Sequence, residues 1–279
     1  MQLYERGKLD INKPLINYLP YFKLNDERYK IITIKQMLNH TSGMPDVEDY
    51  EWDKGISDEG AAERYTRSLN DKELISNPGS EYHYSNIAFE VMSDLIAKVS
   101  GMSFETYVKD NILLPLEMKE SSFYYPEIKK SLRTSPHIGY PPKVSPIYPY
   151  NRMHAPSSTL NTNVLEMSHW AIANMYDGTY KNRQILTPKT HLMMMTPTFT
   201  VNKDNGRKIV LGWFMYPYKG MTNYDHGGSD DGYRSLLTLI PGKKIGIIIL
   251  CNLEDIKMYD IRNKIRDILL SKSSDEISK

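Results

Sequence analysis

Apolar side chains recur at helical spacing over the first three quarters of the chain. Between 85 and 99 they return at steps of three and four residues, which predicts a helix buried along one face. The residues of this stripe are Ile87, Val91, Met92, Leu95, Ile96 and Val99. Further helices are predicted over 58–74 and over 163–175, the latter with Leu165 and Met175 among its core contacts. Thr33 and Ser103 are the predicted N-caps of two shorter helices.

The pattern changes to short apolar runs towards the C-terminus. The runs 209–218, 235–240 and 245–250 are typical of strands, and Pro241–Lys244 predicts a hairpin turn between the last two. A closing amphipathic helix is predicted to cover one face of this sheet. Its apolar positions are Met258, Ile261, Ile265, Ile268 and Leu269. These elements predict an α+β fold, in which an antiparallel sheet is flanked by helices and joined to a mostly helical part.

The chain length fits a single domain over 1–279. We expect a mostly helical part at 40–205, a sheet with the C-terminal helix at 206–272, and a polar tail at 273–279. The stretch 124–150 is rich in proline and tyrosine and only weakly periodic. It predicts a long ordered loop and a candidate wall of a pocket.

The first residues, Met1–Gly7, are typical of the last turns of a helix closed by a glycine. No N-cap or earlier turn stands before them, and isolated helices below about 12–15 residues are marginal. We therefore expect the chain to begin inside an element. Any signal peptide would lie upstream of Met1, so the sequence leaves the compartment open.

Composition narrows the range of partners. The formal net charge is +1, with 35 basic residues spread along the chain, which argues against a nucleic-acid partner. No stretch approaches the roughly 18 apolar residues of a membrane helix. The single cysteine, Cys251, excludes an internal disulfide and is expected to be a buried apolar residue. A small molecule or a peptide is the expected partner, and the oligomeric state is left open.

Two common hydrolase motifs are absent from the sequence. There is no Gly-x-Ser-x-Gly elbow, and the seven histidines form no His-Glu-x-x-His zinc motif. Ser42, in Thr-Ser-Gly, is interpreted as a turn residue and not as a nucleophile. No metal and no cofactor are predicted.

Four stretches, in order, carry a family resemblance. They are Leu38–Pro45 (Leu-Asn-His-Thr-Ser-Gly-Met-Pro), Pro78–Asn86 with its Tyr84-Ser85-Asn86, Ser100–Met118, and Asp225–Gly228 (Asp-His-Gly-Gly). Together they resemble the branch of the serine β-lactamase and penicillin-binding-protein superfamily that includes class C β-lactamases, D-amino-acid peptidases and esterases. Tyr-x-Asn recurs at Tyr180–Asn182, so the first copy is chosen by its place after a Pro-Gly turn and before a helix.

The resemblance implies roles for five residues in acyl transfer. Tyr84 matches the tyrosine that relays the nucleophile's proton, its phenolate favoured by nearby positive charge, and Asn86 matches the asparagine that binds the substrate amide. His226 stands where many relatives have lysine and would orient the tyrosine or the substrate carboxylate. Gly228 would let substrate backbone lie against the strand, and the N–H of Ser229 matches an oxyanion donor.

The serine nucleophile of the family is not encoded in these residues. In the family it comes from a Ser-x-x-Lys turn, and no serine here has a lysine three residues later. The resemblance places that turn upstream of Met1, together with the family's first helix and first two strands. Three explanations stay open: a fragment or internal start of a longer hydrolase, which we prefer; a pseudoenzyme that binds peptidoglycan-like peptides or small acyl ligands; and a non-functional remnant.

Overall fold

A six-stranded antiparallel sheet forms one half of the molecule, with strand order β10-β9-β8-β7-β6-β5. The structure, a computed structural model, describes residues 1–271, so the predicted tail at 273–279 lies outside the described residues. The strands are β5 (Phe199–Asn202), β6 (Arg207–Ile209), β7 (Phe214–Tyr218), β8 (Met221–Asp230), β9 (Tyr233–Ile240) and β10 (Ile245–Cys251). Each strand pairs with its neighbour in sequence, so the connections are short and the α+β prediction is confirmed.

The sheet is larger than the apolar runs predict. It begins at Phe199, ahead of the expected boundary at 206, and its longest strand, β8, was not predicted at all. The motif Asp225–Gly228, which the predicted strands leave out, lies inside β8. Polar residues and glycines fill this strand, and backbone pairing with β9 holds it where side-chain pattern gives no signal. The predicted hairpin turn is confirmed, with Lys244 in the left-handed conformation.

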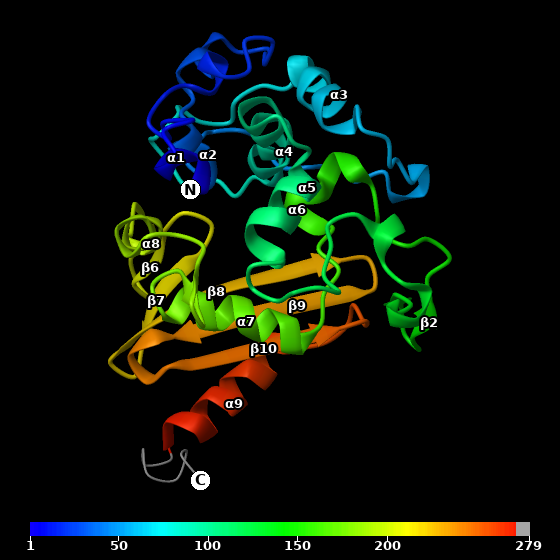
Figure 1. Ribbon diagram of the computed structural model, residues 1–279, viewed down its shortest axis with the longest axis vertical. Coiled ribbons are helices and arrows are strands. Elements are labelled where there is room, and N and C mark those ends of the chain that lie inside the picture. Colours follow the sequence, from blue (N-terminus) through cyan, green and yellow to red (C-terminus); the bar gives the residue numbers. More distant parts are fainter. Residues whose placement is uncertain (272–279) are drawn as a thin grey trace.

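The helices gather mainly on one side of the sheet, as Figure 1 shows, with α9 alone on the other side. They are α1 (Gln2–Glu5), α2 (Ile34–Leu38), α3 (Ala61–Ser68), α4 (Asn86–Ser100), α5 (Phe104–Val108), α6 (Ala155–Ser158), α7 (Val164–Met175), α8 (Pro188–Met195) and α9 (Met258–Ser271). Both predicted N-caps are confirmed: Thr33 forms a capping box with Gln36, and the Ser103 side chain accepts from the Thr106 N–H. None of the helices within 1–271 is long and apolar enough to cross a membrane.

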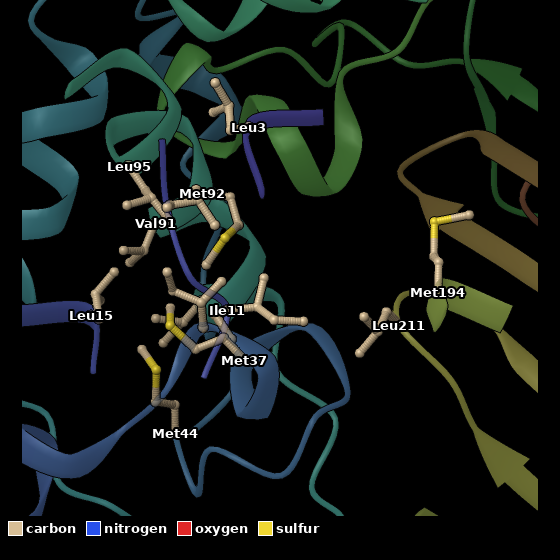
Figure 2. Packing of buried hydrophobic residues seen from close by; sticks show 14 of the residues in the cluster. Leu3, Ile11, Leu15, Met37, Met44, Val91, Met92, Leu95, Met194 and Leu211 are labelled. Atoms are coloured by element: carbon tan, nitrogen blue, oxygen red, sulfur yellow. The ribbon is translucent and has the colours of Figure 1, made fainter. Parts of the chain in front are cut away.

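Helix α4 is the centre of the helical core. Val91 and Leu95 on its buried face contact residues from the first 44 positions, and Figure 2 shows Leu15, Met37 and Met44 gathered around them. The four-residue stripe predicted this face correctly, because Val91 and Leu95 are almost completely buried. A helix fixed on one face this way holds its first turn, and so Asn86, in a defined place.

Four predicted apolar positions are exposed instead: Leu165 on α7, and Ile261, Ile265 and Ile268 on α9. Leu165, expected in the core, is 75% exposed at the start of α7. On α9 the expected apolar face is half open, with Ile268 57% exposed, while Arg262 and Arg266 are buried beside Met258. A buried acidic partner, Asp225, lies 2.9 Å from Arg262 and accounts for this face of α9.

The segment 124–150 contains two short 3-10 turns and a small hairpin, apart from the main sheet. The hairpin pairs β1 (His137–Ile138) with β2 (Lys143–Val144). A second two-stranded hairpin, β3 (Thr179–Tyr180) with β4 (Arg183–Gln184), follows α7.

Candidate active site

A cavity of about 700 Å³ separates the first turn of α4 from β8 and β9. All five residues to which the resemblance assigns a role line it: Tyr84, Asn86, His226, Gly228 and Ser229. Most of the remaining lining is apolar, and includes Phe104, Phe123, Met167, Trp170, Leu237 and Ile248. The loop 124–150, expected to form a wall, contributes none of its described residues to this lining.

The signature Leu38–Pro45 supports Tyr84 from behind. The His40 ring stacks on the Tyr84 ring with centroids 4.1 Å apart, and its Nδ1 accepts the N–H of Ser85 at 3.1 Å. The carbonyl of His40 accepts the N–H of His83 at 2.9 Å. Burial is the main cause that lowers the pKa of His40 to about 3, and His226 contributes to this shift, so the ring is neutral. These contacts make His40 a positioning residue for Tyr84, inside a motif whose role the sequence left unassigned.

Asn86 is held at the start of α4 by two caps. Ser85 is the N-cap and its hydroxyl accepts from the N–H of Ala88, while the N–H of Asn86 donates to Asp46 Oδ1 at 2.7 Å. The carboxylate at the positive end of a helix is favourable and fixes the backbone at Asn86. The amide of Asn86 is left to line the cavity.

The strand β8 presents an open edge to the cavity. From Tyr224 to Asp230 it pairs with β9, but its pairing with β7 stops at Asp225. Beyond that point the second edge of β8 has no strand partner among residues 1–271. A methyl group on Gly228 would lie 2.5 Å from Ser235 Oγ, so glycine keeps this stretch free of side chain.

The ring of His226 lies 6.3 Å from that of Tyr84, centroid to centroid, with Phe214 beside both. Burial lowers the pKa of His226, and Arg207 lowers it further, while Asp225 opposes the shift. His226 is therefore a neutral imidazole near pH 7. It can donate or accept a hydrogen bond, but it supplies no fixed positive charge where many relatives have lysine.

The electrostatics at Tyr84 differ from the expectation of a nearby positive charge. Burial is the main cause that raises the pKa of Tyr84, and Asp46 and Asp230 add to it. The charged residues that contribute most to this shift, Asp46 and Asp230, are both acidic. In this state Tyr84 is a neutral phenol, and a cation near its oxygen is needed before it can act as a base.

Two further acids near the site were not found from the sequence. Asp46 caps the backbone of Asn86, and Asp230 lines the cavity at the end of β8. The signal for Asp46 was its place directly after Leu38–Pro45, and the signal for Asp230 was its even spacing from His226 on one strand. Within 1–271, no three His, Cys, Asp or Glu residues lie close enough to hold a metal ion.

The protein-family model described as "Beta-lactamase" matches residues 1–271. The chain belongs to the β-lactamase family. The curated relative "Protein flp" of Staphylococcus aureus (strain MW2) is 29% identical over 266 residues, which cover 91% of this chain and 50% of that protein. This β-lactamase-family chain thus spans about half the length of these curated relatives.

Solved structures share the fold at lower identity. The octameric penicillin-binding protein homologue from Pyrococcus abyssi has a TM-score of 0.80 at 24% identity, covering 98% of this chain and 63% of that one. A D-stereospecific amidohydrolase from Streptomyces sp. has a TM-score of 0.74 at 20% identity over 91% and 77% of the two chains. A class C β-lactamase reaches 0.74 at 16% identity over 94% and 75%. The β-lactamase and penicillin-binding-protein resemblance is thereby confirmed.

Proposed function

We propose that this chain carries the substrate-binding cleft and proton relay of a serine hydrolase that acts through an acyl-enzyme on an ester or a D-amino-acid amide. The nucleophile of that hydrolase comes from a Ser-x-x-Lys segment outside these 279 residues. The chain alone is therefore inactive. Membership of the β-lactamase family and the fold shared with a D-stereospecific amidohydrolase support this reaction class.

The observation that carries the proposal is the convergence of Tyr84, Asn86, His226 and Ser229 on one cavity beside an open strand edge. A substrate laid along the open edge of β8 would have its carbonyl next to the N–H of Ser229, which stabilises an oxyanion. The amide of Asn86 would bind the substrate's amide from the opposite wall.

The proton follows a defined route in this proposal. The serine oxygen attacks the substrate carbonyl as its proton passes to Tyr84, and Tyr84 returns a proton to the departing alcohol or amine. Water then attacks the acyl-enzyme by the same relay and releases the acid. Because burial and acids raise the pKa of Tyr84, the relay depends on the positive charge that the lysine of Ser-x-x-Lys brings.

Mass spectrometry of the protein after incubation with a D-amino-acid p-nitrophenyl ester tests this proposal. A protein that includes the Ser-x-x-Lys segment of the natural reading frame should gain the mass of the acyl group. Replacing that serine with alanine should abolish the gain. Tyr84→Phe should slow acylation by about 10²-fold or more, the usual range for a lost proton relay. Acylation and turnover by the 279-residue chain alone would overturn the assignment of the nucleophile.

A non-catalytic binder is the second candidate, favoured by the lack of any Ser-x-x-Lys together with a cavity of about 700 Å³. Such a pseudoenzyme would bind peptidoglycan-like peptides or small acyl ligands without forming a covalent bond. It predicts no acyl adduct with any natural form of the protein, and reversible binding to the cavity.

A further inference from the structure

Alternate residues of β8 face the cavity, and the last of them is an aspartate, Asp230. Side chains alternate along a strand, so His226, Gly228 and Asp230 share a face, whereas Asp225 points to α9 and contacts Arg262. Gly228 has no side chain, so the floor between the His226 ring and the Asp230 carboxyl is open. Substrate lying over Gly228 therefore has a carboxyl group one side-chain position further along the strand, about 7 Å away.

Two serines of α6 complete this end of the cavity, and both line it. Ser158 Oγ donates to Asp230 Oδ1 at 3.3 Å, and Ser157 Oγ donates to Glu90 Oε1 at 3.1 Å. Glu90 is 1% exposed, and its Oε1 also lies 2.6 Å from Nδ1 of His154. A carboxylate accepts hydrogen bonds, so both hydroxyl protons can be directed at carboxylate oxygens; Ser157 Oγ also lies 3.3 Å from the carbonyl of His154 and 3.3 Å from Ser158 Oγ. The surface that remains towards the cavity consists of oxygen lone pairs.

The charge at this end is negative. Burial is the main cause that raises the pKa of Asp230 to about 6; Asp231 adds to the shift, and Ser158, Arg234 and His154 oppose it. The guanidinium of Arg234 donates to the backbone carbonyl of Asp230 at 2.8 Å, and no ion pair joins it to the carboxylate within 1–271. Above a pH of about 6, Asp230 is therefore an ionised carboxylate that lacks a counter-ion in the described part of the chain.

The rest of the cavity offers no cationic side chain to an anionic substrate group. No lysine or arginine of residues 1–271 lines it. His226, at the other end of the row, is neutral because burial lowers its pKa. Arg207 stacks on Phe214 outside the lining and acts on His226 only through its field. A carboxylate ligand would be repelled by Asp230, with no cation nearby to compensate, whereas a cationic ligand would be attracted to Asp230.

We propose that Asp230, Ser157 and Ser158 form a subsite for a protonated amine. Resting on the proposed function, this makes the substrate an ester or amide whose acyl part carries a free amino group. An ammonium has three donors and no acceptor, which matches a wall of one carboxylate and two hydroxyl oxygens. The apolar lining takes the hydrocarbon part of the acyl group.

Equilibrium binding to the 279-residue chain tests the subsite, with D-phenylalaninamide compared with 3-phenylpropanamide, which has the same shape without the amine. At pH 7.0, where an α-amino group is still mostly protonated, calorimetry should give at least tenfold tighter binding of the amine. Asp230→Asn should remove this preference, while Asp231→Asn, which removes the same charge from an exposed neighbour, should retain it. The preference should shrink at pH 5, where Asp230 takes up a proton.

Three results would overturn the subsite: equal binding of the two amides, a preference that survives Asp230→Asn, or an equal loss with Asp231→Asn. None of these binding measurements needs a nucleophile, so they test the proposed subsite independently of the proposed hydrolase function. If amine binding depends on Asp230 in a protein that never forms an acyl-enzyme, the proposed subsite stands and the proposed hydrolase function is wrong. If amine-bearing and amine-free esters acylate the protein equally, the hydrolase function stands and the subsite is wrong.

Discussion

Gly43 shows how tightly a single position of the Leu38–Pro45 signature is constrained. Its φ is +74°, and a methyl group built there would lie 2.3 Å from the backbone oxygen of Ser76. We predict that Gly43→Ala lowers the free energy of unfolding by more than about 2 kcal/mol, since left-handed strain and a backbone clash act together. Gly7→Ala is the control: its φ is +65° but nothing lies within 4 Å, so only about 1 kcal/mol should be lost. Urea unfolding of both variants checks this, and equal losses would contradict it.

Asp230 should make stability depend on pH in a direction opposite to that of a salt-bridged acid. Its pKa in the folded protein is raised to about 6, so the folded state holds this proton more tightly than the unfolded state. The contribution of this group is fully present below about pH 4 and is lost as the pH rises through 6. Asp230→Asn should therefore raise the free energy of unfolding at pH 8 by about 1–2 kcal/mol and leave it nearly unchanged at pH 4. Melting curves at the two pH values test this, and a variant less stable at pH 8 would exclude it.

Sequence reasoning found the residues that recur as motifs and missed those that act through position alone. Tyr84, Asn86 and His226 were chosen because they stand in ordered motifs, and the structure brings them to one cavity. Asp230 follows His226 by four residues, but only the strand β8 places both on one face, and β8 has no apolar pattern that predicts it. The acids that raise the pKa of Tyr84, Asp46 and Asp230, come from segments far apart in sequence, so no local pattern indicated them.

Helix α9 illustrates how a buried ion pair overrides an apolar stripe. The predicted face of isoleucines has the correct helical period, yet Ile268 is 57% exposed and the arginine row is buried. Arg262 reaches Asp225 at 2.9 Å and Thr238 at 3.0 Å across the sheet. Asp225 lies on a strand that the sequence did not predict. The sequence therefore could not indicate that this buried carboxylate would pair with an arginine of α9.

Breaking this pair should be much more costly than opening the isoleucine stripe. Arg262→Met leaves the Asp225 carboxylate buried without its cation, and we predict a loss of about 3–5 kcal/mol in the free energy of unfolding. Ile268→Ser, on the exposed side of the same helix, should change it by less than about 0.5 kcal/mol. Thermal or urea unfolding distinguishes the two. A larger effect at Ile268 would mean that the stripe, and not the arginine row, packs on the sheet in solution.

At the scale of the whole molecule, the fold class could be predicted while the limits of the sheet could not. The α+β plan followed from helical periods in the first part and short apolar runs in the last, and both persist in the structure. The site depends on their meeting: the helical part supplies Asn86 at the start of α4 and Tyr84 two residues before it, and β8 supplies His226 and Ser229 from the sheet. Such a meeting of distant segments carries no local pattern, so only the ordered motifs of a family could indicate it.

Strand β10, at the outer edge of the sheet, is expected to promote self-association of the chain. Strand β10 pairs with β9 alone within 1–271, and its residues Ile247–Leu250 are strongly apolar, without lysine or proline to block a further strand. An apolar edge of this kind pairs readily with other strands. We predict that the 279-residue chain self-associates in a concentration-dependent way, and that Ile249→Lys shifts it towards monomer because a charge at the edge opposes strand addition. Ile75→Lys adds the same charge at an apolar residue that is 55% exposed away from β10, and should leave the association unchanged.

Sedimentation velocity on all three proteins measures their association, and circular dichroism checks that each is folded. Equal effects of the two lysines would attribute the association to net charge, and a wild-type chain that stays monomeric at high concentration would show that the edge is protected.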